Sequence, residues 1–290
     1  MGAVCKPVLS AFAAVLLAVV LSAPGAAPGT AEQRLPIFDT HAHYSRDAWA
    51  PYPAARILEI LSAAGVPRAL VSSTPDDGTL TLYRAAPGRV VPILRPYRSR
   101  ADMGDWFARD AVMDYVIERL DRGLHKGIGE FHLWSATEAG TPQMRKLAAL
   151  AVSRGLILHV HAGAAPIRAL FEIEPNLKIL WAHAGMGAPP EVVGELLDRY
   201  ANLRTELSFR AGDVAPGGRL DPAWRALLLR HNDRFMIGTD TYVTARWDAY
   251  RGLVEEHRAW LAQLPPAAAR AIAYGNAVRE FGAGDAQAWK

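Results

Sequence analysis

The feature that most constrains the fold is an alternation of eight short apolar runs with longer amphipathic stretches. Several runs are apolar over four or five consecutive residues, as expected for strands buried on both faces of a parallel sheet. The predicted strands are Ile37–His41, Ala69–Ser73, Val90–Leu94, Gly127–Phe131, Leu156–Val160, Leu177–Trp181, Leu203–Leu207 and Phe235–Thr239. Eight strands that alternate with helices predict a (β/α)₈ barrel.

The stretches between these strands carry apolar residues at helical spacing. The predicted helices are Ala54–Ala64, Trp106–Leu120, Gln143–Val152, Pro189–Tyr200, Pro222–Leu229 and Trp247–Leu261. The pattern is weak at Thr79–Ala85 and short at Pro166–Phe171. An open doubly wound sheet is the competing architecture, but such a sheet has fewer strands and a glycine-rich first turn. The barrel is therefore the preferred fold.

Residues 1–31 have the features of a secretory signal peptide. Lys6 supplies a positive charge, Val8 to Leu21 form an apolar run, and small residues follow. The run is shorter than the roughly 20 apolar residues that a membrane anchor needs, so we expect cleavage and export, either to a periplasm or out of the cell. Residues 32–290, about 260 residues, then form one barrel domain, a usual size for this fold. Cys5 is the only cysteine, so the mature domain has no disulfide.

The charge of the chain argues against two classes of partner. The formal net charge is +3, and basic residues are interspersed with acidic ones. No basic stripe for nucleic acid and no polybasic membrane patch is present in the sequence. We therefore expect a small-molecule substrate and no nucleic-acid partner.

Two histidines, His41 and His43, lie at and just after the end of the first predicted strand. Alternate residues of a strand point to the same side, so the two imidazoles can reach one point. Imidazole nitrogen is a preferred ligand of zinc and its first-row neighbours. Taken alone, a His-x-His pair is a weak signal, because chance pairs occur in loops and on surfaces.

Further metal-competent side chains end later strands: Glu130, His161, His183 and Asp240. A barrel places all strand C-termini around one rim, where catalytic residues are found. Buried acids are costly unless they are paired or bind a metal. An ordinary structural role for Glu130 and Asp240 therefore needs basic partners, and Arg95, Arg98 and Arg210 also follow strands. We favour a metal.

The ordered set of motifs resembles the amidohydrolase superfamily, in particular its amidohydrolase-related (amidohydrolase 2) branch, which includes TatD-like hydrolases. The residues that carry the resemblance are Asp39–His43, Gly129-Glu130, His161–Gly163, His183–Gly185, Gly238–Asp240 and Tyr274–Phe281. The resemblance covers essentially the whole predicted domain. It implies a metal-dependent hydrolase with a (β/α)₈ fold.

The resemblance also implies roles for individual residues. His41, His43 and Asp240 would hold a buried metal, and Glu130 takes a place that in some relatives belongs to a bridging glutamate. His161 and His183 would bind a second metal; in mononuclear relatives His161 joins the first metal and His183 polarises the substrate. Zinc is the first choice, one or two ions, with manganese, iron, nickel or cobalt as alternatives.

The other histidines lie outside this family set. His159 precedes His161 by two residues and should face the same interior, either as a partner of a ligand or as the strand-five ligand itself. We prefer His161, which lies nearer the rim. His132 is not assigned a role, and His125, His231 and His257 are expected at the surface.

A site of this kind performs a limited range of reactions. A divalent metal lowers the pKa of water to about 7, and Asp240 can accept and return a proton. The expected reaction is hydrolysis of an ester, lactone, amide or phosphoester; the alternatives are non-oxidative decarboxylation, a non-catalytic exported metal-binding protein and a metal-independent, carboxylate-based sugar-processing barrel. Loop residues that could bind an anionic or aromatic substrate, or simply cover the barrel mouth, are Trp49, Tyr52, Tyr97, Arg98, Trp134, Phe209, Arg210 and Tyr242.

Overall fold

A computed structural model of the chain describes residues 1–2 and 34–289. Within residues 34–289, eight parallel strands form one sheet in which each strand pairs with the next along the chain. The strands are β1 (Phe38–His43), β2 (Arg68–Ser72), β3 (Val90–Leu94), β4 (Gly127–Leu133), β5 (Ile157–Ala162), β6 (Lys178–Trp181), β7 (Leu203–Glu206) and β8 (Phe235–Met236). The predicted signal peptide lies outside the described residues, apart from the first two.

The sheet closes on itself through a short join between β1 and β8. Asp39 forms a bridge with Ile237, and the backbone N–H of Thr40 donates to the carbonyl oxygen of Ile237 at 2.7 Å. The predicted (β/α)₈ barrel is confirmed. Strand eight is nevertheless shorter than the predicted Phe235–Thr239, because regular pairing with β7 ends at Met236.

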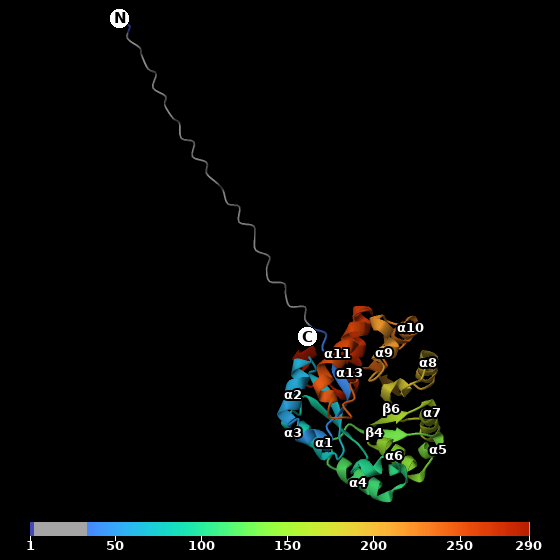
Figure 1. The fold of residues 1–290 in the computed structure, drawn as a ribbon. Helices are drawn as coiled ribbons and strands as arrows, with labels where there is room; N and C mark the ends of the chain where they lie inside the picture. Colours follow the sequence, from blue (N-terminus) through green and yellow to red (C-terminus); the bar gives the residue numbers. More distant parts are fainter. Residues whose placement is uncertain (3–33, 290) are drawn as a thin grey trace. The chain divides into compact units, whose positions relative to one another are not determined.

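Helices lie around the outside of the strands (Figure 1). They are α1 (Arg46–Trp49), α2 (Ala54–Ala63), α3 (Asp77–Ala85), α4 (Asp110–Leu120), α5 (Ala136–Ala139), α6 (Pro142–Ser153), α7 (Ala164–Ile173), α8 (Pro190–Arg199), α9 (Ala211–Val214), α10 (Pro222–Arg230), α11 (Arg246–Leu261), α12 (Pro266–Arg270) and α13 (Asn276–Phe281). No helix in this described part is long and apolar enough to span a membrane.

The helices with weak sequence patterns are real, and one predicted helix is shorter than expected. Residues 77–85 form α3 and residues 164–173 form α7. Each helix buries an apolar face against the sheet. The predicted helix Trp106–Leu120 is interrupted: Trp106–Ala108 form a 3₁₀ turn, and extended Arg109 separates it from α4. The extended residue turns the chain so that buried Trp106 can pack beside Phe131.

An aromatic cluster lies against Phe38, at the start of β1 and so at the end of the strands opposite to their C-termini. The Trp289 ring stacks on Phe38 with ring centroids 5.7 Å apart and on Tyr274 at 5.2 Å. Phe281 of α13 also contacts Phe38. The C-terminal segment therefore completes the apolar interior at this end of the barrel, leaving the other end for polar groups.

Replacing Trp289 by Ala is expected to lower the free energy of unfolding by about 2 kcal/mol, less than the loss at a fully buried tryptophan because Trp289 is only partly buried. Activity at the far end of the strands should not change. Denaturant unfolding measures the effect, with Trp134→Ala, which removes an exposed ring, as the control. Equal stability of both variants would contradict the packing role of Trp289.

Candidate metal centre

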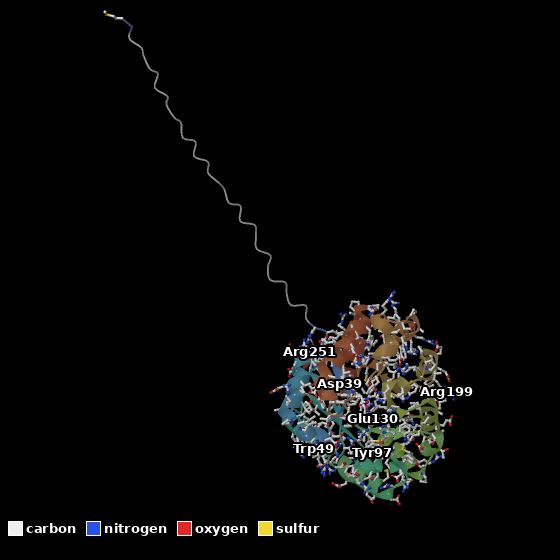
Figure 2. The ribbon with its side chains drawn as sticks, viewed as in Figure 1. Asp39, Trp49, Tyr97, Glu130, Arg199 and Arg251 are labelled. Atoms are coloured by element: carbon white, nitrogen blue, oxygen red, sulfur yellow. The ribbon has the colours of Figure 1, made fainter. Side chains whose placement is uncertain are left out.

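All six predicted metal-site residues come together at the C-terminal ends of the strands. His41 and His43 lie in β1, Glu130 in β4 and His161 in β5. His183 lies in the turn Ala182–Gly185 after β6, and Asp240 follows β8. In Figure 2 Glu130 lies within the ring of elements, whereas Arg199 and Arg251 lie at its outer edge.

His41, His43, Glu130 and Asp240 form a buried group whose ligand atoms all lie within 4.8 Å of one another. The two Nε2 atoms of the histidines are 3.1 Å apart. Glu130 Oε2 lies 3.4 Å from His41 Nε2 and 3.2 Å from His43 Nε2. Asp240 Oδ1 lies 3.6 Å and 3.2 Å from the same two nitrogens.

Hydrogen bonds on the far side of each ring determine which nitrogen faces this group. Nδ1 of His41 donates to Glu206 Oε1 at 3.0 Å, and Nδ1 of His43 donates to the carbonyl oxygen of Ser72 at 2.9 Å. Carbonyl and carboxylate oxygens only accept, so in the neutral ring the proton is on Nδ1 and the lone pair is on Nε2. Two nitrogen lone pairs and two carboxylate oxygens therefore face one another.

This arrangement fits a divalent cation. Asp240 Oδ1 is buried and has no hydrogen-bond partner among the described residues, which is costly for a charged oxygen. Burial alone would lower the pKa of His41, but the facing carboxylates of Asp240, Glu130 and Glu206 outweigh it and raise that pKa well above its usual value. The centre thus favours positive charge, and its imidazole and carboxylate donors suit zinc and its neighbours.

Glu130 presents its second oxygen to a second pair of histidines. Glu130 Oε1 lies 2.8 Å from His161 Nδ1 and 3.4 Å from His183 Nε2, and these two nitrogens are 3.1 Å apart. Burial would raise the pKa of Glu130, but the His41 ring and hydrogen bonds from His161 and His183 hold it well below its usual value. The two oxygens of one carboxylate therefore face opposite histidine pairs.

The three arginines considered as structural partners behave differently. Arg95 donates from Nη2 to Glu130 Oε2 at 3.1 Å, so Glu130 does have a basic partner. Arg98 pairs with Asp102, and Arg210 binds the carbonyl oxygen of His183. Among the described residues no arginine or lysine pairs with the Asp240 carboxylate, so a purely structural role explains Glu130 better than it explains Asp240.

His183 and Asp240 both have left-handed backbone conformations, with φ of 56° and 50°. Such conformations are strained for residues other than glycine and are concentrated at functional sites. Arg246 supports Asp240 by donating from Nε to its carbonyl oxygen at 2.7 Å. Gly129, which precedes Glu130, has φ of 136°, and a Cβ there would lie 2.1 Å from the carbonyl oxygen of His159. Glycine is therefore required at that position.

His159 lies deeper than His161, as its place in the strand predicts. Its ring packs edge-on against His41 with centroids 4.4 Å apart, and its buried Nε2 has no hydrogen-bond partner among the described residues. Burial lowers the pKa of His159 well below its usual value. His161 is the residue whose ring reaches Glu130, so the geometry favours it as the strand-five ligand.

A cavity of about 360 Å³ opens above this centre. Its lining residues are Ser45, Thr74, Arg95, Arg100, Met103, Glu130, His132, Trp134, His161, His183, Met186, Phe209, Asp240 and Tyr242. Three of the predicted loop residues, Trp134, Phe209 and Tyr242, are among them. The other five are absent from the lining, so the cavity gives no support to substrate binding by Trp49, Tyr52, Tyr97, Arg98 and Arg210.

His132 is a cavity residue that sequence reasoning did not assign. The backbone N–H of His132 donates to the Tyr97 hydroxyl at 2.9 Å, and this hydroxyl lies 3.0 Å from His132 Nδ1. Because the hydroxyl accepts the backbone N–H, its own proton is free to bind Nδ1, which leaves the ring proton on Nε2. Burial lowers the pKa of His132 to about 3, so the ring is neutral.

The prediction that three histidines lie at the surface was wrong. His125, His231 and His257 are all buried. His125 binds Asp76 through Nε2 at 2.9 Å, and His257 Nε2 lies 3.0 Å from the carbonyl oxygen of Gly238. Burial lowers the pKa of His257 to about 4. Their polar partners come from other elements, so position in a helix or loop did not indicate exposure.

Two further acids near the centre also escaped prediction. Glu206, on β7, contacts His41 and His183 and is fully buried. Asp39 accepts from the Thr239 and Tyr250 hydroxyls, both at 2.7 Å. The signal for Glu206 was present in the sequence, because it is an acid within the predicted strand Leu203–Leu207, like Glu130 in its own strand.

The chain matches a known protein family in sequence and several solved structures in fold. A family model described as Amidohydrolase matches residues 38–283. No curated protein matches the chain in sequence at a significant level. Solved structures do match in fold, and TatD-family hydrolases are among them.

Three of these structures are a putative hydrolase, an amidohydrolase and a decarboxylase. A putative 2-pyrone-4,6-dicarboxylic acid hydrolase from Pseudomonas putida has 20% identity and a TM-score of 0.59, and covers 86% of this chain and 98% of its own. An amidohydrolase from Burkholderia multivorans with bound zinc has 15% identity and a TM-score of 0.54, covering 85% and 99%. A 2,6-dihydroxybenzoate decarboxylase in complex with 2,6-dihydroxybenzoate has 13% identity and a TM-score of 0.52, covering 85% and 99%.

Proposed function

Because this chain belongs to the amidohydrolase family, and is thus a metal-dependent enzyme of the amidohydrolase type, we propose that it hydrolyses an ester, lactone, amide or phosphoester bond of a small molecule. The observation that carries this proposal is the unpartnered Asp240 oxygen beside two histidine lone pairs. This oxygen belongs to a residue that lines the cavity together with Glu130, His161 and His183.

We assign two cation positions to the centre. His41, His43 and Asp240 would hold the first, His161 and His183 would hold the second, and Glu130 would serve both, because its two oxygens face the two histidine pairs. Zinc is the preferred ion on the basis of the donor atoms, and the zinc-bound amidohydrolase from Burkholderia multivorans supports that choice. A single ion per chain would instead leave His183 free to polarise the substrate.

A divalent cation, when held by these residues, would make hydroxide available at neutral pH, because it lowers the pKa of water to about 7. Asp240 accepts the proton of the attacking water and returns it to the leaving group. His132 lines the cavity, and its Nε2–H could donate to a substrate carbonyl or to the oxyanion that develops from it. Tyr97 holds the His132 ring in the tautomer that makes this donation.

The cavity walls favour a small substrate with an apolar or aromatic body. Trp134, Met186, Phe209 and Tyr242 supply large exposed apolar surfaces. The positive groups are few: Arg95 binds Glu130, and Arg100 binds Asp47 at 2.5 Å. A substrate with one carbonyl or carboxylate group fits this balance better than a polyanion does.

Non-oxidative decarboxylation of an aromatic acid is the second candidate function. The match in fold to 2,6-dihydroxybenzoate decarboxylase and the aromatic cavity wall favour it. The two reactions differ in their products, since decarboxylation releases carbon dioxide without consuming water. Product analysis by mass spectrometry on a panel of aryl esters, lactones and hydroxybenzoates separates them.

Removal of the metal is expected to abolish activity. Protein purified without added metal should contain one or two divalent ions per chain, and a strong chelator should remove both the ions and the hydrolytic activity. Added Zn²⁺ should restore activity in proportion to the ions bound, as measured by elemental analysis beside the assay. Full activity after complete chelation would instead favour a carboxylate-only mechanism.

We also propose that the enzyme is exported, on the basis of the signal-peptide features of residues 1–31. N-terminal sequencing of the protein recovered from the producing cells tests this. Cleavage within the small-residue segment that ends near residue 31 is expected. An intact Met1 on the cell-associated protein would contradict export by this route.

A further inference from the structure

Glu206 is a fully buried carboxylate that touches both halves of the proposed metal centre. Its Oε1 accepts from His41 Nδ1 at 3.0 Å and from the backbone N–H of His183 at 2.6 Å. Ser208 donates to Oε1 from its hydroxyl at 3.1 Å and to Oε2 from its backbone N–H at 2.7 Å. Four donors from β1, the turn after β6 and the loop after β7 thus converge on one side chain.

The contact with His41 fixes the ring proton of a proposed metal ligand. With its proton held on Nδ1 by Glu206, the lone pair of Nε2 points at the centre. Without an acceptor at Nδ1, the neutral ring could place its proton on Nε2, where it would exclude a cation. The carboxylate thus determines whether the ring can act as a ligand.

The contact with His183 acts on its backbone and, through Ser208, on its ring. The backbone N–H of His183 donates to Glu206, and His183 has a φ of 56°. The hydrogen bond therefore offsets part of the strain of that turn. The Ser208 hydroxyl lies 2.7 Å from His183 Nδ1. Glu206 and Ser208 together therefore orient the ligand of the second position.

The charge of Glu206 has no basic partner apart from these histidines. Its ion pairs in the described part of the chain are with His41 at 3.0 Å and with His183 at 3.7 Å. A buried carboxylate without Arg or Lys is costly, unless positive charge is present at the histidines. A cation at either position supplies that charge.

Gly238 shows that the fold makes room for this carboxylate. A Cβ at Gly238 would lie 2.2 Å from Glu206 Oε2 and 2.8 Å from the Cβ of His41. Any larger residue would push the carboxylate away from His41. Glycine two residues before Asp240 therefore permits the close approach of β7 to the join between β1 and β8.

We propose that Glu206 is a positioning residue that sets the metal affinity of both positions at once. It does so by holding His41 in the ligand tautomer and by orienting His183, with Ser208 as its link to the second position. This inference rests on the metal site proposed above.

Glu206→Gln is the principal test, because it keeps the volume of the side chain but removes its charge and one of its two acceptors. Zn²⁺ affinity is measured by competition with a chromophoric chelator. We expect the affinity to fall by about 10- to 100-fold, the usual effect of losing an outer partner of a metal-ligating histidine. Glu172→Gln, which changes an exposed acid on α7, is the matched control and should bind Zn²⁺ like the wild type.

Two readouts distinguish positioning from a general loss of stability. The Nδ1–H proton of His41 should give a downfield resonance in the zinc-loaded wild type and lose or shift it in Glu206→Gln. The rise in melting temperature on adding Zn²⁺ should also be smaller in the variant than in the wild type. A merely structural defect would instead lower the melting temperatures of the metal-free and metal-loaded forms equally.

Ser208→Ala keeps the test decisive if Glu206→Gln does not fold. It removes one hydroxyl and should weaken binding of the second ion while leaving the first unchanged. A folded Glu206→Gln variant with wild-type Zn²⁺ affinity would overturn the inference. If Glu206→Gln does not fold, a Ser208→Ala variant that binds both ions with wild-type affinity would overturn it. A wild-type chain that binds no Zn²⁺ would overturn the proposed metal site itself.

Discussion

Asp240→Asn is expected to lower kcat by about 10³-fold while most of the bound metal remains, within the 10²- to 10⁴-fold range of general acid–base catalysis. The amide oxygen of Asn can still face the two histidine nitrogens that Oδ1 approaches at 3.6 and 3.2 Å. It cannot accept a proton at neutral pH. The substitution therefore separates the proton-transfer role of Asp240 from its role in holding the cation.

The measurement combines metal content with kcat and KM on the best substrate of the panel. Asp233→Asn, an acid-to-amide change at an exposed side chain, is the control for expression and folding. A variant that keeps both its metal and its wild-type kcat would remove Asp240 from the mechanism. A variant that loses all metal would show that holding the cation is its main contribution.

Glu130→Gln is the second substitution with a large expected effect. The wild-type carboxylate presents Oε2 to His41 and His43 and Oε1 to His161 and His183. A glutamine has one oxygen and one NH₂ group, so it can face a cation on one side only. We expect the variant to bind at most one ion per chain and to lose more than about 100-fold in activity, since loss of a direct ligand should exceed loss of an outer partner.

Elemental analysis and Zn²⁺ titration count the ions in this variant. Glu118→Gln, at an exposed side chain of α4, is the matched control. Retention of two ions by Glu130→Gln would contradict the assignment of Glu130 between the two positions. If the wild type itself binds a single ion, the expected change is loss of affinity without a change in stoichiometry.

The barrel was predictable because its signal is repeated eight times along the chain. Several strands are continuous apolar runs, and errors of one or two residues at the end of a strand do not alter the strand count. The rim location of the six site residues follows from the same count, since strand C-termini meet at one end. Because alternate residues of a strand point to the same side, the sequence also predicted that His41 and His43 face one point and that His159 and His161 both point inward.

The remaining errors concern contacts between elements, which a single sequence does not encode locally. His125, His231 and His257 are buried because Asp76, Asp198 and the Gly238 carbonyl reach them from elsewhere in the fold. Arg98 and Arg210 leave the cavity because Asp102 and the His183 carbonyl bind them. Glu206 differs, because it is an acid within its own predicted strand, and the cost of burying an unpaired acid indicates a site residue there as it does for Glu130.

The proposed metal centre also lies at the place where the barrel closes. Regular β8 ends at Met236, and beyond it the backbone N–H of Asp240 donates to the carbonyl oxygen of His41 at 2.6 Å. His41 belongs to the first strand, and Asp240 follows the last strand. A cation bound by both residues would therefore link the beginning of the barrel domain to its end. A bound ion would then join the two ends of the barrel as well as support catalysis. We therefore expect loss of the ion to weaken the contact between the first strand and the segment after the last strand, in addition to removing activity.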